Sequence, residues 1–395
     1  MPEAVIVDCL RTAVGKAPRG TLRNTRPDDL AAFVIRALME KYPAVPKDEV
    51  DDVILGCAMP EGEQGMNMAR VAMVLAGLPH SVGGVTINRF CASGLTALQM
   101  AADRIRVGEA EVMIAGGAES MSLVPMTGNK PSFNPEVFAR DENVGIAYGM
   151  GLTAEKVATL WKVGREAQDA FALQSHQRAL AAIAAGEFKA EMTPVTVTER
   201  APDLAAGGVT LRTRTVDIDE GPRPDTSLEG LGKLKPVFAA KGSVTAGNSS
   251  QTSDGAGALI VCSDKALKTF GLTPLARFVS FAVRGVAPDV MGIGPIEAIP
   301  AALKSAGLQL DDIGWIELNE AFAAQSLAVM NTCGLDPARV NPMGGAIALG
   351  HPLGATGAIR AATVVHALRR RNLKYGMVTM CVGMGQGAAG ILERV

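Results

Sequence analysis

The sequence predicts an α/β fold made of two duplicated α/β units stacked in layers, with a loop domain inserted in the first unit. Three observations predict it: helical and β-branched segments alternate, the same order of elements occurs in both halves, and a long segment rich in Met, Pro and Asn interrupts the first half. A chain of 395 residues exceeds the size at which one core keeps growing, so more than one domain is expected.

The first unit opens with an apolar strand, AVIVDCL, and continues into an amphipathic helix over residues 28–41. An acidic turn at KDEVDD then leads into the strand VILG. A second strand, GGVTIN, is followed by Cys91 and by a helix over residues 92–108. The residues that give the helix over 28–41 its apolar face are Leu30, Phe33, Val34, Ala37 and Leu38.

The second unit repeats this order of elements. A helix over residues 294–307 precedes an acidic turn and the strand IGWIELN, and the stretch from 340 to 371 parallels the strand, turn and helix around Cys91. Both units end in small residues that run into an apolar strand, in TSDGAGALIVCS and in GMGQGAAGILERV. Duplication is the simplest explanation of this recurrence.

We therefore divide the chain into an N-terminal unit of residues 1–121 plus 252–271, an inserted loop domain of residues 122–251, and a C-terminal unit of residues 272–395. The insertion carries one long helix, in REAQDAFALQSHQRALAAIAAGE, followed by polar strands and a Pro-rich turn. Ordered insertions of this length are usually lids or binding loops, so we expect it to contribute to a ligand site.

The composition disfavours several classes of function. Charged residues make up 20% of the chain and the net charge is -2, which leaves no bias toward nucleic acid or an anionic membrane surface. The N-terminus lacks a basic leader and no apolar run is long enough to span a bilayer, so we expect a cytoplasmic protein. Six cysteines without a CxxC pair indicate reduced thiols rather than a disulfide framework or a metal site.

Cys91 is the first candidate for a reactive group. It follows a predicted strand and precedes a predicted helix, so free backbone N–H groups and the positive end of the helix dipole should favour a thiolate there. We therefore expect its pKa to lie below the free value of about 8.5. The alternative is an inert buried thiol, because free cysteines are among the most buried residues.

His351 and Cys381 lie in two other glycine-rich stretches, GGAIALGHPLGATG and MCVGMGQG. Histidine is the usual base for a thiol near neutral pH, and bare backbone after Cys381 could point N–H groups at an oxyanion. We interpret the other histidines, His80, His176 and His366, as structural or surface residues.

One glycine pattern is discounted. Residues 385–390 match the GxGxxG spelling of a dinucleotide site, but only five residues follow them. A dinucleotide fold requires a helix, a further strand and an acidic residue after the motif. No nicotinamide site is predicted, and no P-loop, HExxH or EF-hand spelling occurs.

Four stretches together resemble the motifs of the thiolase family, and those of its degradative 3-ketoacyl-CoA thiolases (acetyl-CoA C-acyltransferases) in particular. INRFCASG is similar to the family's nucleophile motif, ELNEAFAAQ to its Asn-Glu-Ala-Phe motif, NPMGGAIALGHPLGATG to its histidine motif, and CVGMGQG to its C-terminal cysteine motif. They stand in the family's order and span the chain. The resemblance implies the thiolase fold, two stacked α/β units with a loop domain inserted in the first.

The resemblance also implies the chemistry, which is thiolytic cleavage of a 3-ketoacyl-CoA by CoA through a Cys acyl-enzyme, in fatty-acid β-oxidation. Cys91 would attack the ketone, His351 would take its proton, and Cys381 would protonate the leaving carbanion and then activate the incoming CoA thiol. Asn319 would hold a water beside His351 in one oxyanion hole. The N–H groups of Cys91 and Gly383 would form the second oxyanion hole.

Coenzyme A would be a co-substrate, and the resemblance implies no tightly bound cofactor. VTAGNSSQTSDG resembles the family's pantetheine loop, which places Ser250 at the pantetheine. Arg223, in GPRPDTSLEG, corresponds to the family's basic contact with the nucleotide, and the alternative for it is an ordinary solvated charge. The residues implied to line the tunnel that holds the pantetheine are Met150, Phe238, Ala321 and Phe322.

Two departures bear on the subtype. Met384 follows Gly383, as in some degradative members, and AYGMGLTAE has Gly149 where short-chain acetoacetyl-CoA enzymes often have histidine. Both favour longer acyl chains. The alternative is a biosynthetic acetoacetyl-CoA thiolase, which condenses two acetyl-CoA with the same residues. A ketoacyl synthase and a non-catalytic lipid carrier are disfavoured, since Cys381 is kept and no reactive residue is missing.

Partners are implied by the resemblance alone, which indicates a homodimer or a homotetramer. Some bacterial relatives instead pair with a multifunctional hydratase/dehydrogenase subunit, and the sequence leaves these alternatives open. The substrates would be acyl-CoA and CoA, and neither a nucleic acid partner nor a transmembrane segment is expected.

Overall fold

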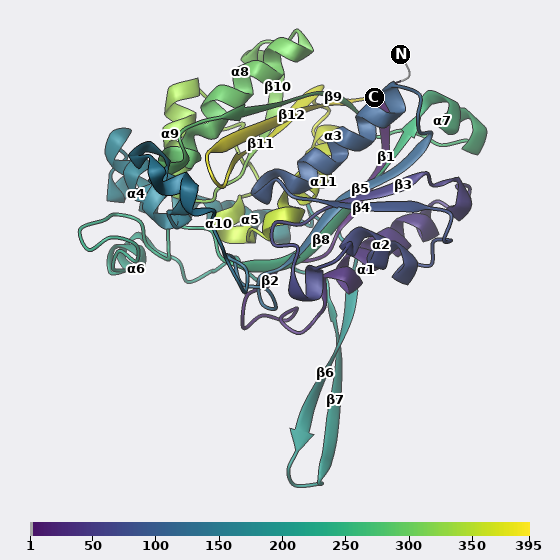
Figure 1. Cartoon of the computed structure of the whole chain (residues 1–395), viewed down its shortest axis with the longest axis horizontal. Coiled ribbons are helices and arrows are strands. Elements are labelled where there is room, and N and C mark those ends of the chain that lie inside the picture. The colour runs from purple at the N-terminus through teal and green to yellow at the C-terminus, as the bar shows by residue number, and fades with distance from the viewer. Residues whose placement is uncertain (1–2) are drawn as a thin grey trace.

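The computed structural model describes residues 3–395 (Figure 1). No helix within this range is both long enough and apolar enough to cross a bilayer. The strands are β1 (Ala4–Arg11), β2 (Gly15–Lys16), β3 (Asp52–Gly56), β4 (Gly83–Ile87), β5 (Val112–Ser120), β6 (Val195–Asp203), β7 (Gly208–Val216), β8 (Ser253–Ser263), β9 (Ala276–Gly285), β10 (Ile313–Leu318), β11 (Tyr375–Val382) and β12 (Gln386–Arg394). The helices are α1 (Pro27–Lys41), α2 (Met68–Leu75), α3 (Ser93–Arg106), α4 (Met150–Leu160), α5 (Arg165–Ala184), α6 (Leu228–Gly232), α7 (Asp264–Phe270), α8 (Gly294–Ala306), α9 (Ala323–Cys333), α10 (Ala346–Leu349) and α11 (Leu353–Arg370).

The two halves of the chain share one topology. The strand order is β10-β11-β12-β9-β1-β8-β5-β3-β4, so the first half reads β4-β3-β5-β8-β1 and the second half repeats it as β10-β11-β12-β9. A parallel bridge between Ile316 and Val340 stands beside β10 in the place that β4 occupies beside β3. The predicted duplication is therefore confirmed.

Two helices, α3 and α11, lie between the two halves of the chain and separate them into layers. Within residues 3–395, the strands of the two halves pair only along β1 and β9, where Val5 pairs with Arg277 and Ile6 pairs with Ala276. Elsewhere α3 and α11 lie between the halves, and α11 packs on strands of both (Figure 1). Helices α1 and α2 cover the outer face of the first half, and α8 covers that of the second. The predicted stacking is thus confirmed, and helices α3 and α11 lie between the layers.

The central helices approach so closely that only small residues fit between them. A Cβ at Gly357 would lie 2.2 Å from the backbone N of Leu95, and a Cβ at Gly94 would lie 2.7 Å from the backbone N of Ala358. Both distances are far below an ordinary packing contact. Side chains of α11 must therefore be small where it meets α3, and Gly357 and Ala358 stand at this contact.

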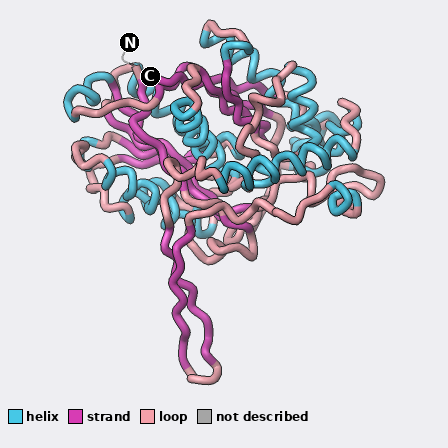
Figure 2. Tube along the Cα trace, turned by 180° about the vertical axis from the view of Figure 1, so that it is seen from behind, coloured by secondary structure: helices cyan, strands magenta, loops and turns pink. Residues whose placement is uncertain are grey.

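The segment between β5 and β8 contains the elements predicted for the insertion. The predicted long helix is α5, and the predicted polar strands are β6 and β7, a hairpin that projects from the body of the molecule (Figures 1 and 2). Helix α4 was missed because glycines at and near its start obscure the helical pattern. The exact limits of the three predicted domains stay predictions.

Buried ion pairs fix the base of this hairpin. Arg11 of β1 lies 2.6 Å from a carboxylate oxygen of Glu191 and 2.8 Å from one of Asp219, which precede β6 and follow β7. All three side chains are almost fully enclosed. Removing one partner of a buried pair leaves an uncompensated charge and costs about 3–5 kcal/mol, so this contact holds the insertion on the first unit.

We predict that Gly357→Ala lowers the free energy of unfolding by about 1–3 kcal/mol, because α3 and α11 must move apart to admit the methyl group. Chemical denaturation followed by circular dichroism measures the change. The matched control is Gly232→Ala at the end of the exposed helix α6, where a Cβ meets no heavy atom within 4 Å. That variant should be neutral or slightly stabilised. Equal losses in both variants would contradict the close-contact argument.

Candidate active site

Cys91 lies between β4 and α3, in a single turn of 3-10 helix over Phe90–Ala92. The backbone of this turn is strained, since Phe90 has a φ of 43°, in the left-handed region that residues other than glycine rarely adopt. The hydroxyl of Ser93 supports the turn by donating to the Phe90 carbonyl at 2.7 Å and accepting from the Arg89 N–H at 2.8 Å. The predicted position of Cys91 between a strand and a helix is confirmed.

The prediction of a lowered pKa for Cys91 is wrong. The residue is 1% exposed, and this burial raises the pKa of the thiol to about 12. The backbone N–H groups of Gly383 and of Cys91 itself lower the pKa, as expected for a helix start, but by less than burial raises it. Cys91 therefore rests as a neutral thiol and needs a base at the moment of reaction.

His351 lies two residues before α11 and is buried. Its ring nitrogens have different partners: Nε2 lies 3.2 Å from Asn319 Nδ2, and Nδ1 lies 2.6 Å from Thr356 Oγ1. Burial, and then the charge of Arg360, lower the pKa of His351 to about 3. The imidazole is therefore neutral near neutral pH and can accept a proton.

Cys381 lies near the end of β11, one residue before the chain turns toward β12. Burial raises the pKa of this thiol, and the nearby Cys91 raises it further, so the two sulfurs are close enough to interact electrostatically. Asn319 follows β10, and its N–H donates to the carbonyl of Thr379 in β11 at 2.9 Å. The side chains of Asn319 and Cys381 are thus carried by neighbouring strands.

The structure brings several of the predicted reactive residues into pairwise contact. The N–H of Gly383 donates to Cys91, the start of α11 packs on the turn that carries Cys91, and Asn319 contacts His351. One thiol comes from the first half, and the imidazole, the amide and the second thiol come from the second half. The packing of α3 against α11 is what joins the two sets.

Two supporting side chains were missed by the sequence analysis. Glu119, at the end of β5, accepts the N–H of Ala58 at 2.7 Å and that of Gly354 at 2.8 Å, which ties the loop after β3 to the first turn of α11. Burial raises the pKa of Glu119. The other is Thr356, the partner of His351 Nδ1. No spacing marks Glu119, whereas Thr356 stands five residues after His351 within the histidine motif.

The residues predicted to line the pantetheine tunnel lie beside the second thiol. Ala321 and Phe322 share its apolar cluster, and Met150 packs against that cluster. The rings of Phe238 and Phe322 meet edge to face, with 6.0 Å between centroids. The N–H of Ser250 donates to the carbonyl of Ala321 at 2.9 Å, so the predicted pantetheine loop adjoins the same cluster.

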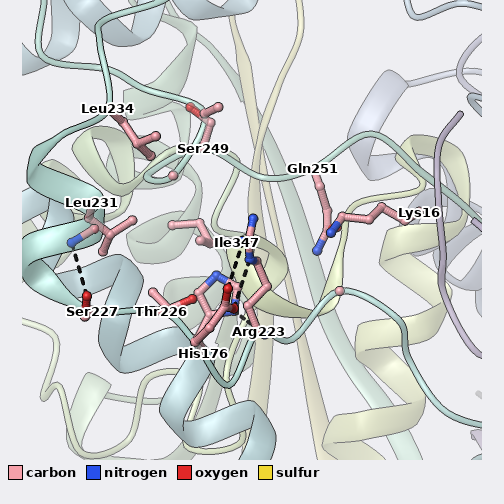
Figure 3. A pocket seen from close by; sticks show the side chains of 15 residues that line it. Lys16, His176, Arg223, Thr226, Ser227, Leu231, Leu234, Ser249, Gln251 and Ile347 are labelled. Atoms are coloured by element: carbon pink, nitrogen blue, oxygen red, sulfur yellow. Dashed lines mark hydrogen bonds and ion pairs between the residues drawn. The ribbon is translucent and has the colours of Figure 1, made fainter. Parts of the chain in front are cut away.

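Arg223 lies apart from this group, in a cavity of about 280 Å³ (Figure 3). Its guanidinium is mostly exposed and pairs with Asp225 at 3.3 Å. The cavity adjoins the tunnel residues through Ser249, which lines it and forms a backbone bridge with Phe322. The predicted nucleotide contact and the predicted pantetheine contact therefore belong to neighbouring parts of one surface.

Three further polar residues of this cavity were missed: Lys16, His176 and Gln251 (Figure 3). His176 was interpreted as structural, and it does support the backbone of Arg223, but it also lines the cavity. Its Nδ1 accepts the backbone N–H of Arg223 at 3.2 Å, and burial followed by the charge of Arg223 lowers its pKa to about 4. These residues come from separate segments of the chain, so no spacing in the sequence could have grouped them.

The other two histidines agree with their interpretation. His80 is exposed, and the ring of His366 is buried with Nε2 3.0 Å from the Cys9 carbonyl. The atoms of Asp8, Cys9 and His366 lie within 4.8 Å of one another, a spacing that a metal site would share. Their groups are already used, however, because Asp8 also accepts the hydroxyl of Tyr42 at 3.0 Å. We interpret this cluster as packing.

Sequence comparison agrees with the fold. The models of the thiolase N-terminal domain and the thiolase C-terminal domain match residues 4–265 and 272–394. The chain belongs to the thiolase family.

Its relatives have the same length and architecture. The chain is 50% identical to the 3-ketoacyl-CoA thiolase of Bacillus subtilis (strain 168), over 100% of both proteins. Among solved structures, it is 38% identical to the Bacillus anthracis acetyl-CoA acetyltransferase, with a TM-score of 0.90. It is 40% identical to the human mitochondrial 3-ketoacyl-CoA thiolase, with a TM-score of 0.88. Both matches cover 100% of this chain and 99% of the other.

We predict that the rate at which iodoacetamide alkylates Cys91 shows no sigmoidal step between about pH 5 and about pH 9. The pKa of Cys91 is raised to about 12 and that of His351 is lowered to about 3, so neither group changes charge in this range. Mass spectrometry of the Cys91 peptide measures the rate, with the half-buried Cys333 as internal reference. A sigmoidal pH profile of the alkylation rate with a midpoint near neutral pH would contradict the conclusion that Cys91 and His351 both rest uncharged.

Proposed function

We propose that this chain catalyses the thiolytic cleavage of a 3-ketoacyl-CoA by CoA, giving acetyl-CoA and an acyl-CoA two carbons shorter, in fatty-acid β-oxidation. The observation that supports the proposal is that two buried thiols interact with each other, while α11, which follows the neutral imidazole of His351, packs on the turn that carries Cys91. A relative with 50% identity that is named 3-ketoacyl-CoA thiolase supports it. The chain is accordingly an acyltransferase.

The first half-reaction forms the acyl-enzyme. The Sγ of Cys91 attacks the ketone carbon, and the thiol proton passes to Nε2 of His351. The bond between C2 and C3 of the substrate then breaks, and its electron pair remains on C2. Cys381 donates its proton to C2, so acetyl-CoA leaves and Cys91 carries the shortened acyl group as a thioester.

The second half-reaction transfers the acyl group. The thiolate of Cys381 takes the proton of the incoming CoA thiol, and the CoA sulfur attacks the thioester carbon. Cys91 leaves and recovers its proton from His351. Each residue returns to its starting state, and the kinetics should be ping-pong because acetyl-CoA leaves before CoA reacts.

Two oxyanion holes fit the polar groups around these side chains. The Oδ1 of Asn319 is buried and has no hydrogen-bond partner within residues 3–395, which suits a bound water beside His351. The N–H groups of Gly383 and Cys91 already point at the sulfur of Cys91, where the ketone oxygen would develop charge. Removing one such donor typically costs about two powers of ten in rate.

CoA is a co-substrate in this scheme, and no tightly bound cofactor or metal is needed. The cavity that holds Lys16 and Arg223 suits its phosphates, since both side chains are cationic and Arg223 is mostly exposed. Ser250 would contact the pantetheine, next to the apolar tunnel. The need for two reduced thiols supports a cytoplasmic location.

The alternative is a biosynthetic acetoacetyl-CoA thiolase, and the Bacillus anthracis acetyl-CoA acetyltransferase has the same fold. The residues would be the same, because a catalyst lowers the barrier in both directions. The residue before Met150 favours the degradative reaction. Gly149 is exposed and a Cβ there would meet no heavy atom within 4 Å, so no side chain of this residue limits the acyl chain where short-chain enzymes often have histidine.

The test of the proposed function is CoA-dependent cleavage, followed at the absorbance of the magnesium–enolate complex of the substrate. We predict that Cys91→Ala and Cys381→Ala each lower kcat/KM by at least about a thousandfold. Cys333→Ala is the control, since Cys333 is half-buried at the end of α9 and outside the site. If Cys91→Ala kept thiolysis within tenfold of the wild type, the mechanism would be ruled out.

The same assay tests the chain-length preference. We predict that Gly149→His lowers cleavage of 3-ketodecanoyl-CoA and 3-ketopalmitoyl-CoA relative to acetoacetyl-CoA by about tenfold, because the imidazole fills the space beside Met150. Gly164→His is the matched control, since Gly164 also precedes a helix and a Cβ there also meets no heavy atom within 4 Å. An unchanged profile in Gly149→His would contradict the assignment of this space to the acyl chain.

We also propose that the chain forms a homotetramer built from two dimers. β4 ends the strand order, and apolar side chains on the neighbouring α2 are exposed: Val71, Val74 and Leu75. An open strand edge beside apolar groups suits pairing with a second copy.

The projecting hairpin exposes Leu204 and Leu211, which suits contact between dimers. With a chain mass of 40.9 kDa, light scattering should give about 4 × 40.9 kDa, and about 2 × 40.9 kDa after Leu204→Ser with Leu211→Ser. A monomer would contradict the proposal.

A further inference from the structure

The side chain of Thr356 joins His351 to the first turn of α11. Its hydroxyl lies 2.6 Å from His351 Nδ1 and 3.0 Å from the carbonyl oxygen of Pro352. Thr356 is 1% exposed and His351 is 4% exposed, so bulk water does not compete for these bonds. The contact sits on the side of the imidazole opposite to Nε2, which the proposed mechanism uses as the base.

The donors and acceptors around His351 form one chain. A hydroxyl has a single proton, and the bond from Thr356 to the Pro352 carbonyl uses it. Oγ1 must then accept from His351, so the ring proton lies on Nδ1. Nε2 is left with a lone pair, which accepts from the Nδ2 of Asn319 at 3.2 Å. In this series of hydrogen bonds, each donor therefore has an acceptor, from Asn319 through His351 and Thr356 to Pro352.

The other neutral tautomer, with the proton on Nε2, would also find a hydrogen-bond partner. If the proton moved to Nε2, the Oδ1 of Asn319 could accept it after rotation of the amide, since that oxygen has no hydrogen-bond partner within residues 3–395. Nothing in the imidazole itself opposes this exchange, because both neutral tautomers are accessible to an isolated ring. The bond to Thr356 is therefore the contact that selects between the two.

We propose that Thr356 is a positioning residue that holds His351 in the tautomer with its proton on Nδ1, so that Nε2 carries a lone pair. This lone pair accepts from the Nδ2 of Asn319 in the resting state and takes the proton of Cys91 once that bond is released. This inference deepens the proposed function and rests on it for the role of Cys91. Without the hydroxyl, the Nδ1 proton would be buried with no acceptor, and the ring would adopt the tautomer that bonds to Asn319 and lacks a base on that side.

The test is the rate at which iodoacetamide alkylates Cys91 at neutral pH, read by mass spectrometry in the full-length protein. Thr356→Val keeps the shape but removes the hydroxyl, so alkylation should slow by about 100-fold, the usual contribution of a general base. Thr356→Ser keeps the hydroxyl and should stay within threefold of the wild type. In a His351→Ala background, Thr356→Val should slow the reaction no further, because the base it positions is absent.

The matched control lies on the same helix. Thr363 is buried, and its hydroxyl lies 3.2 Å from a carbonyl four residues earlier, that of Ile359, and 2.9 Å from Oε1 of Glu191, outside the site. Thr363→Val should therefore leave the alkylation of Cys91 unchanged. Alkylation of Cys333 in every sample reports on folding, and Thr356→Ala replaces Thr356→Val if the valine variant does not fold.

Three outcomes would overturn the proposal: alkylation in Thr356→Val within threefold of the wild type, Thr356→Ser as slow as Thr356→Val, or a further loss when Thr356→Val is added to His351→Ala. The alkylation assay uses no acyl-CoA. If the wild type failed to cleave any 3-ketoacyl-CoA while the alkylation pattern held, the positioning role would stand and the proposed function would fall.

Discussion

The close crossing of α3 and α11 is the constraint on which the site depends. Cys91 precedes α3, and His351 precedes α11, so the position of each reactive group is set by the start of a central helix. The helices can cross at this distance only because Gly94 and Gly357 carry no Cβ. A wider crossing would separate the sulfur from the imidazole while leaving both halves folded. The packing of two duplicated units is therefore also the step that assembles the chemistry.

Burial at this crossing determines the protonation states. A thiol at a helix start would be acidic in water, but here the loss of hydration outweighs the N–H groups of Gly383 and Cys91, and the pKa is raised to about 12. The same burial lowers the pKa of His351 to about 3. A resting ion pair would require two charges in an apolar interior, whereas two neutral partners avoid that cost until a substrate is bound. In the proposed mechanism, proton transfer would then coincide with attack on the carbonyl.

The sequence predicted the architecture well because repeated spacing survives in the chain itself. The matching order of helix, acidic turn and strand in the two halves revealed the duplication, and glycine-rich stretches marked Cys91, His351 and Cys381. Burial depends on how the layers assemble and cannot be read from local sequence, so the pKa of Cys91 was predicted to be lowered whereas it is raised. Lys16 and His176 were missed for a related reason, since only the folded insertion places them in one cavity.

The polarity of the site changes with depth, and this gradient separates binding from chemistry. Arg223 is mostly exposed at the cavity, where charge on a ligand can be matched without removing it from water. Around Cys381 the lining is apolar, with Ala321 and Phe322 in the same cluster. A thioester formed there is shielded from bulk water, so the incoming thiol rather than hydrolysis can resolve it. In the proposed scheme, the charged end of CoA would bind at the cavity, away from the reacting sulfur. The thiol of Cys91 and the imidazole of His351 would then stay neutral until the ketone reaches them.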